Sequence, residues 1–240
     1  MYLTRFRVNT ARVGARKLLS SPQAMHAAVM AGFPKALPGD TGGPRVLWRV
    51  DRNAKAEMFL YVVSPDRPDY THLVEQAGWP TAGSGWEAHE YAPFLAKLAA
   101  GEVWAFRLTA NPVHNIRIKA GEPTKVTAHV TWRHQMGWLL ERQKGAGFQV
   151  LRKPEERRKL GDDDEHELLV HGQRRIEFGK GERNRSRDSR RVRLNTVTFD
   201  GRLEVTDPDA LRRTLTSGLG RAKAYGCGLM TLAPVKGQPR

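Results

Sequence analysis

The order of strand and helix signals in residues 1–92 is the feature that most restricts how this chain can fold. Alternating apolar and polar side chains predict strands, and helix-start and turn residues separate them. The expected elements are a strand at Tyr2–Val8, a helix from Pro22 to about Gly32, strands at Arg45–Val50 and Met58–Val63, a helix near Tyr70–Ala77 and a strand near Trp86–Tyr91. The resulting order, β-α-β-β-α-β, is that of the ferredoxin-like unit.

The same order repeats in residues 93–240, although the two halves share no evident sequence identity. This repeat comprises strands at Val103–Ala110, Phe148–Leu151, Val192–Val205 (one long strand or a hairpin) and Gly228–Ala233, and helices at Trp132–Lys144 and Pro208–Thr216. A further strand is expected at Arg174–Phe178. We therefore predict an α+β protein of two tandem ferredoxin-like (RRM-like) domains, residues 1–92 and residues 93–240.

The charge of the chain favours a polyanionic partner. The formal net charge is +15 and the pI is about 10.4. Residues 1–92 hold 11 basic and 8 acidic side chains, whereas residues 93–240 hold 29 and 17. A field concentrated in one part of a chain indicates a binding face, with nucleic acid as the first expectation.

Other classes are excluded by composition. The single Cys227 cannot form an internal disulfide or a CxxC metal site. We find no apolar run that could span a bilayer and no signal-peptide core, so a cytoplasmic protein without a membrane partner is expected.

The densest positive charge lies in Gly179–Arg193, which has seven Lys or Arg side chains and almost no apolar ones. Such a segment cannot join a core, and between two expected strands it forms a loop or hairpin tip. Arginine-rich fingers suit a groove lined with phosphates; the alternative is a solvated loop. The candidate RNA-binding residues here are Lys180, Arg183, Arg185, Arg187, Arg190 and Arg191.

The glycine-rich segment Gly218–Gly228 is a second candidate RNA contact. It is not a dinucleotide fingerprint, because Lys223 occupies the third glycine position and the segment follows a helix instead of a strand. Glycines permit turns that expose N–H groups to phosphates, although a simple connector would also use them. The candidate residues are Gly218, Gly220, Arg221, Lys223 and Tyr225.

His26 is the candidate catalytic residue. Ser21 and Pro22 form a helix start, and Met25, Val29 and Phe33 give that helix an apolar stripe beside which His26 lies. A lone histidine is usually structural, but an imidazole can act as base or acid in RNA cleavage. Residues 12–19 before the helix are expected to form a basic connector, whose Arg16 and Lys17 could stabilise phosphate charge.

Neither a metal nor another cofactor is expected. Residues 162–166 read Asp-Asp-Asp-Glu-His, but consecutive carboxylates diverge, and the run follows a basic stretch as a mixed surface loop would. We find no HExxH, EF-hand, GxSxG or Walker A pattern.

Taken in order, four stretches of the chain resemble the CasE-type CRISPR RNA-processing endoribonucleases of Cascade systems. They are MYLTRFRVN, MHAAVMAGFP, GEVWAFRLTANPV and GLGRAKAYGCGLMTLAP. The resemblance implies two ferredoxin-like domains and metal-independent cleavage of the CRISPR repeat hairpin at its base, leaving a 2′,3′-cyclic phosphate and a 5′-hydroxyl. It also implies that the protein stays on its product as a partner of the other Cascade subunits.

Carried onto this sequence, the family's helix histidine falls on His26, and a tyrosine common one turn earlier is replaced by Gln23. An amide cannot exchange a proton near neutral pH, so His26 would act with a cation such as Arg16, Lys17 or Lys35. The basic hairpin corresponds to Lys180–Arg193 by position and charge. Two alternatives stay open: a subunit that binds the RNA hairpin without cutting it, and a basic assembly protein of a larger ribonucleoprotein.

Overall fold

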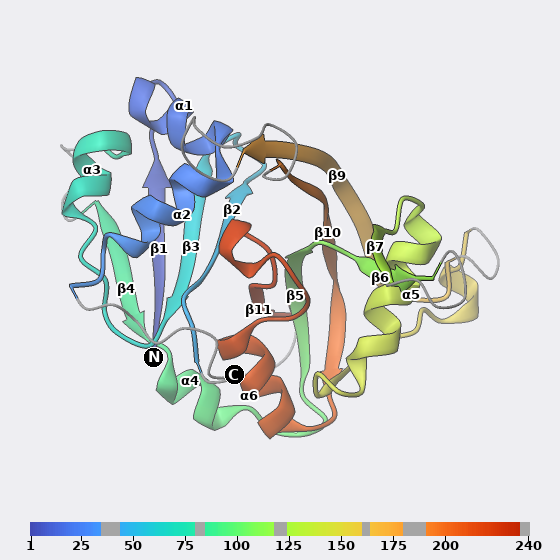
Figure 1. Cartoon of the computed structure of the whole chain (residues 1–240). Coiled ribbons are helices and arrows are strands. Elements are labelled where there is room, and N and C mark those ends of the chain that lie inside the picture. Colours follow the sequence, from blue (N-terminus) through green and yellow to red (C-terminus); the bar gives the residue numbers. More distant parts are fainter. Residues whose placement is uncertain (35–43, 80–84, 118–123, 160–163, 180–190, 236–240) are drawn as a thin grey trace. The chain divides into compact units, whose positions relative to one another are not determined.

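The computed structural model describes residues 1–34, 44–79, 85–117, 124–159, 164–179 and 191–235 (Figure 1). Its contacts group into two compact units. The first comprises Met1–Lys97, Leu215–Gly218 and Ala222–Leu229, and the second Leu98–Thr214, Leu219–Arg221 and Met230–Arg240. The domain limits expected from the sequence, 1–92 and 93–240, stay a prediction, because these units are not continuous in the chain.

The first unit is built on a four-stranded antiparallel sheet in the order β2-β3-β1-β4. Its strands are β1 (Tyr2–Val8), β2 (Leu47–Arg52), β3 (Met58–Ser64) and β4 (Trp86–Glu90). Along β1, Thr4, Phe6 and Val8 are buried while Arg5 and Arg7 are exposed. This alternation gives the sheet one apolar face, and helices α1 (Val13–Ser20), α2 (Pro22–Met30) and α3 (Thr71–Ala77) pack on it (Figure 1).

Helix α2 starts as the sequence predicts. The Ser21 hydroxyl accepts a hydrogen bond from the Ala24 N–H at 3.2 Å, and Pro22 occupies the first turn, where its missing N–H costs nothing. The helix ends at Met30, two residues before the expected end at Gly32. Met25 and Val29 of the expected stripe are buried in the core.

The expectation of a basic connector over residues 12–19 is wrong, because these residues form most of α1. Ala15 and Leu18 are buried in the core, and Arg16 and Lys17 lie on the exposed side. The basic side chains made a short amphipathic helix difficult to recognise in the sequence. Its few apolar side chains are enough to stabilise the helix because they pack against the sheet. Helix α4 (Ala92–Lys97) was also not expected.

The second unit repeats the sheet order, β11-β5-β10-β8, with β9 also paired to β10. Its elements are β5 (Val103–Ala110), α5 (Trp132–Gln143), β8 (Phe148–Val150), β9 (Leu168–Gly179), β10 (Arg191–Val205), α6 (Pro208–Ser217) and β11 (Met230–Pro234). When the four strands of each path are numbered along the chain, both paths have the order last, first, third and second. The predicted fold class, two tandem ferredoxin-like domains, is confirmed.

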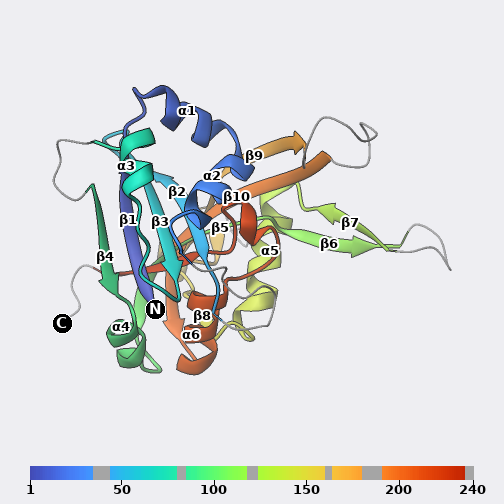
Figure 2. The same ribbon diagram turned by 60° about the vertical axis from the view of Figure 1, so that its left-hand side comes forward.

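Two hairpins extend the second unit. Strands β9 and β10 pair from Leu168 to Gly179, with a register shift where Gly172 adopts a φ of +64°, and such a bulge strengthens the local twist of the strands. Strands β6 (Val113–Ile116) and β7 (Lys125–Ala128) form a separate hairpin that was not expected (Figure 2).

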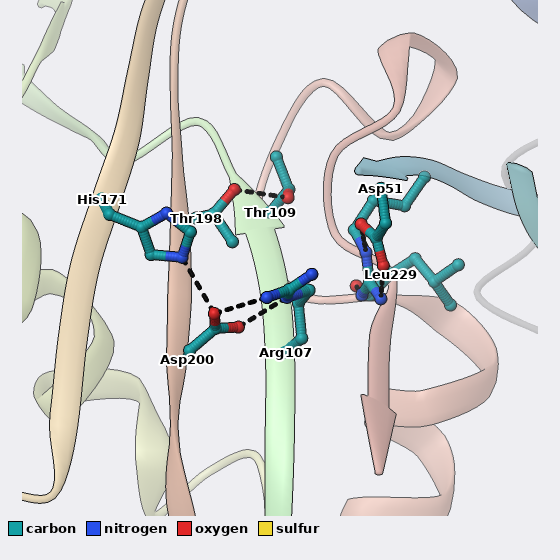
Figure 3. A network of polar contacts seen from close by, with 8 residues as sticks. Asp51, Arg107, Thr109, His171, Thr198, Asp200 and Leu229 are labelled. Atoms are coloured by element: carbon teal, nitrogen blue, oxygen red, sulfur yellow. Dashed lines mark hydrogen bonds and ion pairs between the residues drawn. The ribbon is translucent and has the colours of Figure 1, made fainter. Parts of the chain in front are cut away.

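A polar network joins three strands of the second sheet. Arg107 on β5 donates two hydrogen bonds of 2.6 Å to Asp200 on β10, and His171 on β9 lies 2.9 Å from the same carboxylate (Figure 3). Burial acts to raise the pKa of Asp200, but the bonds and charges of Arg107 and His171 outweigh it, so the pKa is lowered. The carboxylate therefore stays ionised and holds the strands together.

A buried arginine fixes the end of the glycine-rich segment to the first sheet. Arg49 on β2 is only 2% exposed. Its guanidinium donates to both carboxylate oxygens of Asp51, at 2.7 and 2.8 Å, and to the carbonyl of Leu229 at 2.8 Å (Figure 3). A charge removed from water needs this degree of pairing, so the position of Leu229 is tightly determined.

We predict that Arg49→Met lowers the free energy of unfolding by about 3–5 kcal/mol, because it leaves Asp51 and the Leu229 carbonyl without their donor. Arg5→Met is the matched control. Its ion pair with Glu87 is about half exposed, so the expected loss is at most about 1 kcal/mol. Urea unfolding of both variants measures the difference, and equal losses would show that the Arg49 contacts do not carry this stability.

Candidate functional site

His26 lies on α2 beside the buried Met25 and is itself partly buried. Its Nδ1 is shielded from solvent and has no hydrogen-bond partner in the described part of the structure. A buried polar atom without a partner costs free energy and is unusual in a folded protein. The imidazole is therefore held by the helix and its packing, with one ring nitrogen uncommitted.

The surroundings of His26 favour its neutral form. Burial lowers the pKa of the imidazole below its usual 6.5, and the charge of Arg45 lowers it further. At neutral pH the ring is therefore deprotonated and can accept a proton, which a general base requires.

Arg45 is a functional candidate that the sequence did not reveal. It directly precedes the buried residues that lead into β2, and its backbone N–H donates to the Thr216 carbonyl at 3.2 Å. The sequence marks it only as the start of a strand, and its spacing from His26 carries no periodic signal. Its charge acts on His26 through the fold, so only the structure relates the two.

The other candidates near His26 are placed on exposed surfaces. Helices α1 and α2 pack together, and the side chains of Arg16 and Lys17 on α1 are exposed, as is that of Gln23 three residues before His26. No hydrogen bond joins these three side chains to His26 among the described residues. Lys35 lies outside the described residues.

The glycine-rich segment is brought to the helix of His26. Residues Lys223–Tyr225 form a 3-10 turn, η3, which packs against both α2 and β2. The Lys223 ammonium donates to the Ser217 carbonyl at 2.7 Å, and Tyr225 is partly buried. Within the first unit, therefore, the structure places part of this segment beside the candidate catalytic helix.

Two glycines of this segment meet conformational limits that other residues would violate. Gly226 has a φ of +79°, and a Cβ there would lie 2.7 Å from Cζ3 of Trp48. Gly220 has a φ of +84°, and a Cβ there would lie 2.9 Å from Cζ2 of Trp138. The predicted RNA contacts at Gly218, Gly220, Arg221, Lys223 and Tyr225 stay predictions, but the glycines have a clear structural requirement.

Only the base of the basic hairpin is described. Lys180, Arg183, Arg185, Arg187 and Arg190 lie outside the described residues, and Arg191 begins β10. In the described part of strands β9 and β10, the side chains of Arg174, Arg175 and Arg193 are exposed, and the Arg193 guanidinium lies 3.5 Å from the Glu177 carboxylate. The phosphate-binding role of the hairpin therefore stays a prediction.

The thiol of Cys227 and the carboxylate of Asp164 are not available as reactive groups. Cys227 is buried, which raises the pKa of its thiol to about 12 and keeps it protonated. Asp164 is bonded to Lys153 and to the N–H of Lys159. Within the described ranges, no cluster of three His, Cys, Asp or Glu side chains could hold a metal ion, and no helix is long and apolar enough to cross a membrane.

Comparison with known proteins identifies the family. A family model described as CRISPR associated protein matches residues 1–234. The chain belongs to this family of CRISPR associated proteins. It is 28% identical to the CRISPR-associated endoribonuclease Cse3 of Thermus thermophilus, over 98% of this chain and all of that protein.

A second relative and a solved structure agree. The Cascade subunit CasE of Escherichia coli is 26% identical over 79% of this chain and 89% of its own length. A structure of the endoribonuclease Cse3 bound to a 19-nucleotide RNA superposes with a TM-score of 0.76 at 28% identity, covering 98% of this chain and all of that one. The resemblance to CasE-type CRISPR-associated proteins is thus confirmed.

We predict that Gly226→Ala destabilises this protein more than Gly101→Ala does. Both glycines have positive φ, so alanine is strained by about 1–2 kcal/mol at either position. Gly101 has no other atom near its missing Cβ, whereas Gly226 faces Trp48, which adds about 1–3 kcal/mol. Thermal unfolding of the two variants isolates the Trp48 contact, and equal melting temperatures would contradict it.

We also predict that His26 titrates below 6.5 and that Arg45→Gln raises its pKa, since this change removes a positive charge that disfavours the imidazolium. Proton NMR of the His26 ring over a pH series measures both values. Arg16→Gln is the control, because Arg16 is not among the groups that shift His26. An unchanged His26 pKa in Arg45→Gln would contradict the electrostatic coupling.

Proposed function

We propose that this CRISPR-associated protein is a metal-independent endoribonuclease that binds the repeat hairpin of precursor crRNA and cleaves at its base. The observation that carries the proposal is His26, a partly buried imidazole on α2 that burial and the charge of Arg45 keep neutral at neutral pH. Its relative Cse3 is named an endoribonuclease and has been solved with RNA bound. After cleavage the protein stays on its product as a subunit of Cascade, in which CasE is named a subunit.

The proposed chemistry needs no cofactor. His26 accepts the proton of the 2′-hydroxyl, and the 2′-oxygen forms a bond to the adjacent phosphorus. The bond from phosphorus to the 5′-oxygen breaks, that oxygen takes up a proton from water, and His26 releases the proton it accepted back to water. The products are a 2′,3′-cyclic phosphate and a 5′-hydroxyl, so atoms and charge balance.

Cations supply the remaining stabilisation in this proposal. The pentacoordinate phosphate carries extra negative charge, which in this proposal Arg45 offsets; its positive charge already lowers the pKa of His26. Lys17, Arg16 and Lys35 are further candidates. The amide of Gln23 cannot exchange a proton at neutral pH, so the proton transfer depends on His26 alone, and we expect slow, single-turnover cleavage.

RNA binding in this proposal divides between two segments. The glycine-rich segment contributes Gly218, Gly220, Arg221, Lys223 and Tyr225, of which the last two belong to the turn packed on α2. The basic hairpin contributes Lys180, Arg183, Arg185, Arg187, Arg190 and Arg191 and follows the phosphates of the duplex stem. The alternative function, a subunit that binds the hairpin without cutting it, is favoured by one feature, the exposed Gln23 at the position of the family's tyrosine.

We predict that His26→Ala abolishes cleavage of a repeat-hairpin RNA, in EDTA and with enzyme in excess, and leaves hairpin affinity within about twofold. The reason is that the imidazole moves the proton but does not hold the RNA. A 2′-deoxy nucleotide before the scissile phosphate is expected to block cleavage by the unchanged protein, because the nucleophile is absent. Product ends are identified by mass spectrometry.

The matched variant is Gln23→Ala, which alters the same exposed turn without touching the imidazole and is expected to cleave at nearly the original rate. Cleavage by His26→Ala would contradict the catalytic assignment. Tight binding by the unchanged protein without cleavage would favour the non-catalytic alternative.

A further inference from the structure

The outer face of the first sheet has a hollow that the proposed cleavage site does not use. Arg5 and Arg7 project from β1 on the side opposite the buried Phe6 and Val8, and they pair across to Tyr61 and Phe59 of β3. With residues of the neighbouring segments they enclose a volume of about 320 Å³. Because α2 packs on the other face of this sheet, the hollow and His26 are separate.

In this hollow, arginine guanidinium groups lie over aromatic rings. The Arg5 guanidinium lies 5.6 Å from the centre of the Phe59 ring, and that of Arg7 lies 5.2 Å from the Trp79 ring. Trp79 is 38% exposed, so part of its ring is open to a further group. Stacked planar groups of this kind favour a flat, delocalised ligand.

The charges of the hollow are balanced. Arg5 donates two hydrogen bonds to Glu87, at 2.9 and 3.1 Å, and Arg7 donates one to Glu57 at 2.6 Å. A hydrogen bond from Asn53 is the main cause of a lowered pKa at Glu57, so this carboxylate stays ionised and accepts donors. A phosphate would meet two carboxylates here, and a charged protein side chain would have to displace an ion pair.

We propose that this hollow binds one unpaired nucleobase of the single-stranded RNA that flanks the hairpin. A base is planar and neutral, and its edge offers amino groups to the carboxylates and carbonyl or ring-nitrogen acceptors to the guanidinium groups. Unpaired bases are commonly bound by stacking on aromatic rings or on arginine. Pockets for small ligands start at about 300 Å³, so the volume suits a single base.

The inference rests on the proposed RNA-binding function and is tested with two RNAs. One is the bare repeat hairpin, and the other carries five unpaired nucleotides on each side; both have a 2′-deoxy at the scissile position so that neither is cut. We expect the flanks to increase affinity and Trp79→Ala to remove at least about fivefold of that gain, since stacking on one aromatic ring is worth about that much. Affinity for the bare hairpin should be unchanged.

Trp132→Ala is the matched control. Trp132 is also a partly exposed tryptophan, at 44%, with Arg133 near its ring, but it lies in the second unit on α5. It should keep the full gain from the flanks. Arg7→Gln gives a second measurement if Trp79→Ala fails to fold, because it removes the guanidinium layer and leaves Trp79 in place.

The outcomes are distinguishable from those of the proposed function. Failure to bind the bare hairpin would overturn the proposed function, while binding of a five-nucleotide single strand, lost in Trp79→Ala, would still support the hollow. A gain from the flanks that both Trp79→Ala and Arg7→Gln retain would overturn the nucleobase site. So would protection of Trp79 from chemical modification by another protein subunit but not by RNA.

Discussion

The buried guanidinium of Arg49 is the contact on which the candidate site most depends. Arg49 belongs to β2, and its guanidinium donates to the backbone carbonyl of Leu229, the residue that directly follows the glycine-rich segment. Asp51 neutralises the charge of the guanidinium. An apolar residue could fill the same volume but could not pair with that carbonyl. The Lys223–Tyr225 turn is thus fixed against α2 and β2 from its C-terminal side, and at Gly226 by the close approach to Trp48.

Partial burial of His26 accounts both for its unpartnered Nδ1 and for the lowered pKa of its ring. Shielding from water leaves Nδ1 without a partner and lowers the pKa of the ring, and the charge of Arg45 adds to the second effect. In the proposed reaction, the same positive charge would also favour the anion that forms when an RNA phosphate is attacked. One cation would then act on both the proposed base and the transition state.

Elements with a clear local signal could be predicted from the sequence, and relations between distant residues could not. Alternation along Tyr2–Val8 and the Ser21-Pro22 start identified β1 and α2. Helix α1 was missed because Arg16 and Lys17 hid the apolar pair Ala15 and Leu18, and β6 and β7 were missed because four-residue strands offer too little alternation. The electrostatic link of Arg45 to His26 and the bond of Arg49 to Leu229 arise only from tertiary packing.

The alternation along β1 also separates the face that supports the helix of His26 from the face that carries the proposed nucleobase site. Residues that face the core support the helix of His26, and the intervening Arg5 and Arg7 face the charge-balanced hollow. The phosphate contacts proposed for the basic hairpin would weaken steeply as salt rises, because they release counterions. Stacking of a base in a hollow whose arginines are already paired releases few ions. Single-stranded flanks therefore should contribute a larger share of the total affinity at high salt than at low salt.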